Sequence, residues 1–132
     1  MRRRILFDTG FFHVYFSGLN EEAKRAVKEV YSGKSVGYTL DLNLAEFLYT
    51  YGKVKGVETA KVRLSLILSS PIKVVSTDKE LALRAGELKL EHHNLSIVDC
   101  FVVALAEREN AVIYTTDSEI KRAYKNTIVL RS

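Results

Sequence analysis

The stretch Ile5-Leu6-Phe7-Asp8 is a short apolar run that ends in an acidic residue. The stretch Val112-Ile113-Tyr114-Thr115-Thr116-Asp117 has the same arrangement near the other end of the chain. Short apolar runs rich in β-branched and aromatic residues are typical of strands buried on both faces of a parallel sheet. If these two strands are neighbours, their carboxyl ends share one sheet edge, and we expect Asp8 and Asp117 to lie there together.

The rest of the chain alternates short apolar runs with longer amphipathic stretches, which is typical of an α/β fold with a mostly parallel sheet. The strands that we expect lie at residues 4–8, 35–39, 72–75, 111–114 and 127–130. Helices are expected between them. Their start signals are Asn20, Asp41, Gly56, Thr77, Ser96 and Asp117, with the helix after Gly56 ending before Pro71.

Composition indicates one globular domain over residues 1–132, since 47% of the chain is hydrophobic and 27% is charged. The single cysteine, Cys100, excludes an intramolecular disulfide and fits a reducing cytoplasm, where we expect the protein. The apolar run after the basic start is interrupted at Asp8, so we expect no signal peptide. The net charge of +4 favours a nucleic-acid partner only weakly.

Two further acidic residues lie among apolar neighbours in predicted helices. Glu46 lies in the second turn of the helix after the second strand, and Asp99 lies in the first turn of the helix before the fourth. A carboxylate in such a place is costly without a partner. Both helix starts are expected to face the edge that carries Asp8 and Asp117.

Four carboxylates at one edge repel one another strongly. Two of them about 4 Å apart repel by about 4 kcal/mol at an effective dielectric of 20. Mg²⁺ or Mn²⁺ removes this repulsion, since both prefer carboxylate oxygens and water as ligands. The hydroxyl and amide groups expected to hold the carboxylates or a metal-bound water belong to Thr9, Asn43, Ser96 and Thr115. The pattern therefore favours metal-dependent phosphate chemistry.

At these residues the chain resembles PIN-domain proteins, and most of all the single-domain toxin ribonucleases of VapC type. The resemblance covers nearly the whole chain. The matching pieces are Leu6-Phe7-Asp8-Thr9, Asn43-Leu44-Ala45-Glu46, Leu95-Ser96-Ile97-Val98-Asp99 with Ala104-Leu105-Ala106, and Tyr114-Thr115-Thr116-Asp117. At the last of them Thr116 stands where the family usually has asparagine, and the aromatic residue that usually follows is absent.

The resemblance implies a three-layer α/β/α sandwich with a parallel central sheet. It also implies an endoribonuclease that depends on Mg²⁺ or Mn²⁺ and hydrolyses RNA phosphodiesters with a metal-activated water. Asp8, Glu46, Asp99 and Asp117 match the family's catalytic metal-binding acids. Such toxins often form homodimers and are silenced by an antitoxin protein, so we expect both partners.

Other interpretations of the same residues stay open. Asp8 and Asp117 are also suited to cap helices, and Asp41 and Asp78 are read mainly as cap or first-turn residues. Two groups of cations are candidates for holding RNA. The first group is Lys121, Arg122 and Lys125, and the second is Lys53, Lys55, Lys61 and Arg63. The alternative function is a catalytically inactive PIN-like module that binds RNA or protein, and a phosphatase-like domain ranks last.

Overall fold

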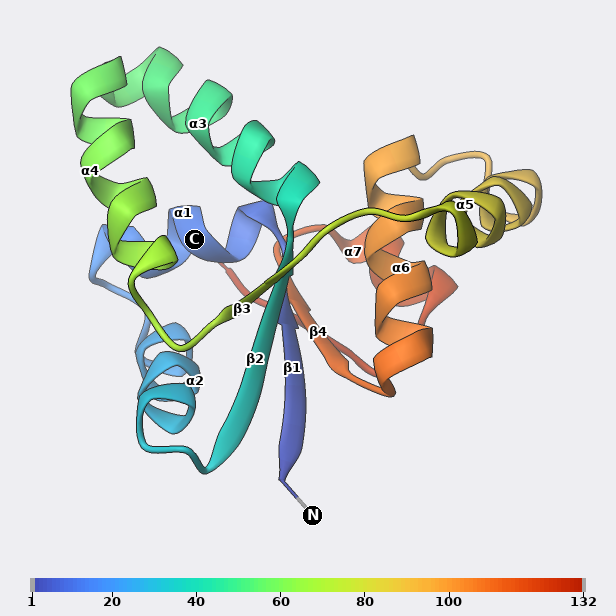
Figure 1. The fold of residues 1–132 in the computed structure, drawn as a ribbon, viewed down its shortest axis with the longest axis horizontal. Coiled ribbons are helices and arrows are strands. Elements are labelled where there is room, and N and C mark those ends of the chain that lie inside the picture. Colours follow the sequence, from blue (N-terminus) through green and yellow to red (C-terminus); the bar gives the residue numbers. More distant parts are fainter. Residues whose placement is uncertain (1, 132) are drawn as a thin grey trace.

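The computed structural model describes residues 2–131 and has a five-stranded, all-parallel sheet in the order β3-β2-β1-β4-β5. The strands are β1 (Arg3–Phe7), β2 (Ser35–Leu40), β3 (Lys73–Val75), β4 (Val112–Thr115) and β5 (Thr127–Val129). The helices are α1 (Thr9–Ser17), α2 (Glu21–Tyr31), α3 (Asp41–Lys55), α4 (Val57–Leu68), α5 (Lys79–Glu91), α6 (Ile97–Glu109) and α7 (Ser118–Ala123). Figure 1 shows the sheet between two groups of helices.

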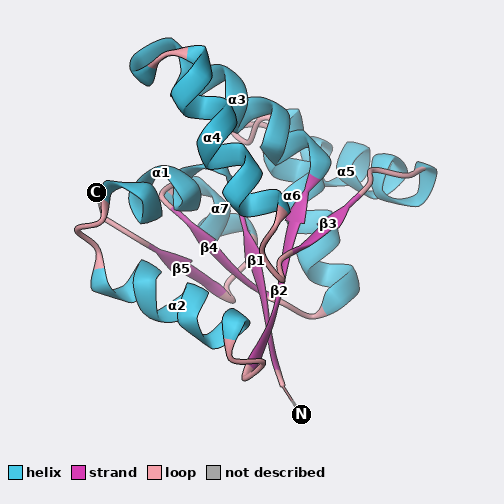
Figure 2. Cartoon of the chain, turned by 60° about the vertical axis from the view of Figure 1, so that its left-hand side comes forward, coloured by secondary structure: helices cyan, strands magenta, loops and turns pink. Residues whose placement is uncertain are grey.

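The sheet separates two hydrophobic clusters because successive side chains of a strand point to opposite faces. Ile5 and Phe7 of β1 pack into the cluster that α1 to α4 cover, whereas Leu6 packs into the cluster that α5, α6 and α7 cover. All three side chains are fully buried. The molecule is therefore the expected α/β/α sandwich, with β1 at its centre (Figure 2).

The five predicted strands are confirmed, each with ends within one residue of the expectation. Asn20 and Ser96 cap α2 and α6 through their side chains, as predicted, and α4 begins after Gly56 and ends before Pro71. No helix among residues 2–131 is both long and apolar enough to cross a membrane.

Asp41 and Thr77 were wrong as helix caps, whereas the interpretation of Asp41 and Asp78 as cap or first-turn residues is confirmed. Asp41 is the first residue of α3 rather than its cap, because its carboxylate accepts from the Thr77 backbone N–H at 3.2 Å and thereby ties α3 to the segment after β3. Thr77 is for this reason not the cap of α5. The side chain of Asp78 caps that helix by accepting from the Leu81 N–H at 2.8 Å.

Helix α1 was not predicted as a helix at all. Its sequence, Thr9–Ser17, carries five aromatic residues, counting His13, and aromatic side chains have only moderate helix propensity. Asp8 begins the helix by accepting from the Gly10 N–H, and Gly18 ends it in the left-handed conformation with φ +74°. The capping interpretation of Asp8 thus holds, and it does not compete with a ligand role because a carboxylate has several lone pairs.

Candidate functional site

Asp8 and Asp117 lie at the same edge of the sheet because β1 and β4 are parallel neighbours, with Phe7 paired to Tyr114. Thr115, at the end of β4, links the two acids. Its hydroxyl donates to Asp8 Oδ2 at 2.7 Å and accepts from the Asp117 backbone N–H at 3.0 Å. The Thr115 side chain is fully buried, so it fixes the Asp8 carboxylate in one orientation.

Asp99 lies in the first turn of α6, which Ser96 caps by accepting the Asp99 N–H at 3.0 Å. Burial raises the pKa of the Asp99 carboxyl to about 6, and the negative charges of Asp117 and Glu46 raise it as well. Burial likewise raises the pKa of Asp8 to about 7, with a further contribution from the charge of Asp99. The four acids therefore belong to one electrostatically coupled cluster.

Glu46 reaches this cluster from α3 and is held by neighbours at the start of α1. The Thr9 hydroxyl donates to Glu46 Oε1 at 2.8 Å, and Asn43 Nδ2 donates to the same hydroxyl at 3.1 Å. Asn43 also accepts from the Leu40 N–H at 3.3 Å, which anchors it where β2 passes into α3. Thr9 and Asn43 thus orient Glu46 from two different segments.

No cation of the protein neutralises these charges. Within residues 2–131, none of the four acids makes an ion pair with a lysine, an arginine or a histidine. A cluster of hard oxygen donors, in which Asp8 and Asp99 have raised pKa values and which has no counter-ion among the described residues, matches the chemistry of a divalent cation. The residues present therefore fit a Mg²⁺ or Mn²⁺ ion.

The side chains do not converge on a single point. In the part of the chain that the structure describes, no group of three or more His, Cys, Asp or Glu side chains is close enough to hold a metal ion as it stands. The fit to Mg²⁺ or Mn²⁺ therefore rests on the donor type and the charge of these side chains.

The cations predicted to follow the fourth acid are partly engaged elsewhere. Lys121 Nζ donates to the Thr127 carbonyl at 2.7 Å, and Arg122 lies 3.8 Å from the carboxylate of Glu119 in its own helix. Lys125 is exposed beyond the end of α7. The structure gives none of the three a contact with the acidic cluster.

One feature next to the acids was missed from the sequence. His13 Nε2 lies 2.8 Å from the Thr50 hydroxyl, one helical turn beyond the Thr9–Glu46 contact on both α1 and α3. The Thr50 hydroxyl donates its only proton to the Glu46 carbonyl at 2.7 Å, so it accepts from His13 Nε2–H. Burial lowers the pKa of His13, which favours the neutral ring. We refer to the two contacts between α1 and α3, Thr9 with Glu46 and His13 with Thr50, as the seam. The only sequence signal for it is the i, i+4 spacing of Thr9 with His13 and of Glu46 with Thr50.

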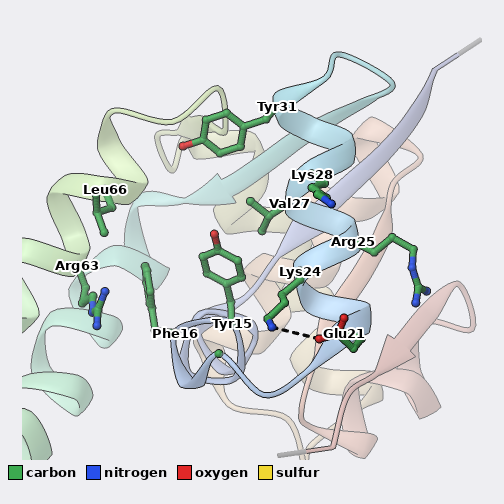
Figure 3. Close-up of a pocket in the computed structure, with 11 residues that line it drawn as sticks. Tyr15, Phe16, Glu21, Lys24, Arg25, Val27, Lys28, Tyr31, Arg63 and Leu66 are labelled. Carbon is green, nitrogen blue, oxygen red and sulfur yellow. Dashed lines mark ion pairs between the residues drawn. The ribbon is translucent and has the colours of Figure 1, made fainter.

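A groove of about 700 Å³ lies between α1, α2 and α4, and none of the four acids lines it. Figure 3 shows its aromatic side chains, Tyr15, Phe16 and Tyr31, and the cations that surround them. Those cations are Lys24, Arg25, Lys28 and Arg63. Glu21 is its single acid and pairs with Lys24 at 3.1 Å. The groove is therefore apolar in part and positively charged at its rim.

Comparison with known proteins gives one family match and a set of similar folds. The model of the PIN domain matches residues 5–126. VapBC2 from Rickettsia felis, crystallised with a DNA fragment from its promoter, is similar with a TM-score of 0.76 and 19% identity, over 96% of this chain and 97% of that one. No curated protein matches the sequence.

Two other solved structures have the same fold. VapC20 from Mycobacterium tuberculosis, described as a toxin that cleaves the sarcin-ricin loop, is similar with a TM-score of 0.74 and 21% identity, over 91% of this chain and 95% of that one. FitAcB from Neisseria gonorrhoeae is similar with a TM-score of 0.71 and 15% identity, over 96% of both chains. At these identities the likeness concerns the fold.

Proposed function

The chain belongs to the PIN domain family, and we propose that it is a metal-dependent endoribonuclease, the toxin of a toxin–antitoxin pair. One observation carries this function: four acids of one coupled cluster, two of them with raised pKa values, lie at a sheet edge without any internal counter-ion. VapC20, which has the same fold, is described as a toxin that cleaves the sarcin-ricin loop. The RNA substrate and the metal dependence are our inference from the site.

Asp8, Asp99, Glu46 and Asp117 are the residues that would hold Mg²⁺ or Mn²⁺. The ion would supply charge to stabilise a phosphodiester under attack and would lower the pKa of a water molecule. Thr115 holds the Asp8 carboxylate through its 2.7 Å hydrogen bond, and Thr9 holds Glu46 at 2.8 Å. These two hydroxyls orient carboxylates that would hold the cation.

We infer that an antitoxin is the protein partner, since several similar structures are toxin–antitoxin complexes. The groove between α1, α2 and α4 supports this inference, because its aromatic side chains and basic rim suit a peptide with apolar and acidic residues. A homodimer is also part of the proposed state. Leu83 and Leu90 of α5 are 71% and 87% exposed and leave an apolar face for a second copy.

The test combines Mn²⁺ calorimetry with cleavage of a labelled RNA pool, for the wild-type protein and Asp99→Asn. We expect the wild type to bind Mn²⁺ and cleave RNA, and the variant to lose both while keeping its circular dichroism spectrum. The matched control is Glu80→Gln, which removes an exposed acid from α5 and should change neither readout. An Asp99→Asn variant with wild-type cleavage contradicts the function. Metal binding without any cleavage favours the inactive binding module.

A further inference from the structure

A second groove, of about 410 Å³, lies between α1, α3 and α4, and we refer to it as the α3 groove. Its volume falls in the range of about 300–1,000 Å³ that ligand sites occupy. Three helices contribute side chains to it. They are His13, Phe16 and Ser17 from α1, Tyr51, Val54 and Lys55 from α3, and Thr59 and Arg63 from α4. Phe16 and Arg63 also line the groove that we assign to the antitoxin, and the function proposed above makes no use of the other six residues.

The α3 groove continues the seam that begins at the acidic cluster. Thr9 contacts Glu46 at 2.8 Å, and one turn farther His13, which lines the groove, contacts Thr50 at 2.8 Å. Lys55 lies nine residues after Glu46 on the same helix, about 13 Å along its axis. A polymer bound at Glu46 therefore reaches the groove within a few of its units.

The charge of the α3 groove is positive and uncompensated. Lys55 and Arg63 line it, and no aspartate or glutamate is among its lining residues. Within residues 2–131 neither cation has a carboxylate oxygen within ion-pairing distance, whereas Arg4, Arg84 and Arg108 all pair with acids. Two cations left free beside an open groove attract an anion, and each nucleotide of RNA carries one.

Aromatic rings form the wall of the groove and orient one of its cations. The Arg63 guanidinium lies over the Phe16 ring, 5.2 Å from its centroid, and Figure 3 shows the two side chains next to each other. Tyr51 packs against His13 with ring centroids 5.6 Å apart. Arg63 is thus held in place rather than free in solvent, which reduces the entropy lost when it binds a phosphate. Aromatic rings beside cations are the usual surface for single-stranded nucleic acid.

We propose that the α3 groove holds the RNA strand that flanks the scissile phosphodiester, with Lys55 and Arg63 bound to its phosphates, an inference that rests on the proposed nuclease function. The occupant is single-stranded RNA because the groove offers cations and aromatic surface together, and because its residue His13 lies one helical turn from Thr9, which contacts Glu46 of the acidic cluster. Val54, which is 77% exposed at the groove, is the position where an added charge acts on the strand without disturbing the core.

The experiment measures binding alone, so that it does not depend on catalysis. Fluorescence anisotropy of a fluorescein-labelled single-stranded RNA of mixed sequence is followed with excess EDTA over a range of salt concentrations. Arg63→Gln should weaken binding about tenfold, which corresponds to about 1.4 kcal/mol, because it removes one charged contact with a phosphate. It should also reduce the slope of log K against log salt by about 0.7, as expected for one lost phosphate contact.

Matched controls carry the same change of charge outside the groove. Lys34→Gln removes one positive charge from an exposed residue just before β2, at the edge of the sheet opposite the acids, and Lys34 is not among the residues of the groove. Val54→Glu adds a negative charge inside the groove and should weaken binding, whereas Val62→Glu adds the same charge at a position on α4 that is 60% exposed and outside the groove. Both controls should leave the salt slope unchanged.

Three results overturn the assignment of the groove to RNA. They are unchanged RNA affinity in Arg63→Gln and Val54→Glu, an equal loss in the controls, and no RNA binding by the wild type. If affinity is unchanged while Asp99→Asn abolishes cleavage, the nuclease function stands and an acidic peptide becomes the better occupant. If the groove variants lose RNA and the wild type never cleaves it, the groove stands and the nuclease function falls.

Discussion

Asp99→Asn should make the metal-free protein more stable near pH 8, although it removes a residue that we place at the active site. The folded state raises the pKa of Asp99 from 3.8 to about 6, through burial and through the charges of Asp117 and Glu46. The folded protein therefore holds this proton more tightly than the unfolded chain does. Stability from this group is fully present below pH 4 and is lost as the pH rises through about 6. Asparagine carries no charge and avoids the loss.

The size of the effect follows from the shift. About two pKa units correspond to about 3 kcal/mol, since one unit is worth about 1.4 kcal/mol. Asp99 is only partly buried, and solvent screening reduces the expected gain to about 1–2 kcal/mol. For a chain of this length that gain raises the Tm by about 5 °C.

Thermal unfolding followed by circular dichroism with excess EDTA, near pH 8 and near pH 4, measures this gain. The variant should unfold at a higher temperature than the wild type near pH 8 and at nearly the same temperature near pH 4. Added Mn²⁺ should then stabilise the wild type and leave the variant unchanged. A variant that is less stable than the wild type near pH 8 refutes the reasoning, because Asp99 would then be stabilised and not strained by its surroundings.

Three other outcomes follow from the same contacts. Because the pKa values of Asp8 and Asp99 are about 7 and about 6, protons compete with the cation, and calorimetry should show Mn²⁺ affinity falling by about three orders of magnitude from pH 8 to pH 5. A flat profile speaks against a carboxylate site. Thr115→Val removes the 2.7 Å hydrogen bond to Asp8 and should cost about 1–2 kcal/mol in urea unfolding and weaken Mn²⁺ binding. Gly37→Ala places a methyl group 3.0 Å from an aromatic ring of the core and should cost about 1–3 kcal/mol, whereas Gly86→Ala, in open space on α5, should stabilise by about 0.5–1 kcal/mol.

The strands were predictable because they are buried on both faces, and a strand buried on both faces consists of a short continuous run of apolar residues. Leu6 and Ile113 illustrate this, since each is fully buried in the centre of its strand. Helix α1 was not predictable in the same way. Tertiary packing buries Phe11 and Phe12 against the sheet. The helix propensity of phenylalanine is too weak to predict this helix from the sequence.

The same contrast applies to the candidate site: positions that the sheet determines could be predicted, whereas contacts between helices could not. The order of strands explains why Asp8 and Asp117 share an edge, and a residue at the end of a strand keeps that position in any parallel sheet. Contacts between two helices leave no comparable pattern in the sequence. The hydrogen bond between His13 and Thr50 joins residues 37 positions apart, and its existence depends on how α1 packs on α3. The roles of the acids in binding metal and in cleavage stay predictions that the experiments above decide.

The position of the acids at helix starts explains how the protein tolerates them before a cation arrives. Asp8 caps α1 by accepting the Gly10 N–H at 2.9 Å, Asp117 caps α7 by accepting the Glu119 N–H at 2.9 Å, and Asp99 lies in the first turn of α6. The partial positive charge of each helix start stabilises a carboxylate by about 0.3–1 kcal/mol. These contributions offset part of the repulsion and leave the rest to be relieved by the metal ion. Capping and metal binding therefore both use the negative charge of these carboxylates. Removing one acid should reduce the repulsion between carboxylates in the folded protein and should also weaken its binding of the metal ion.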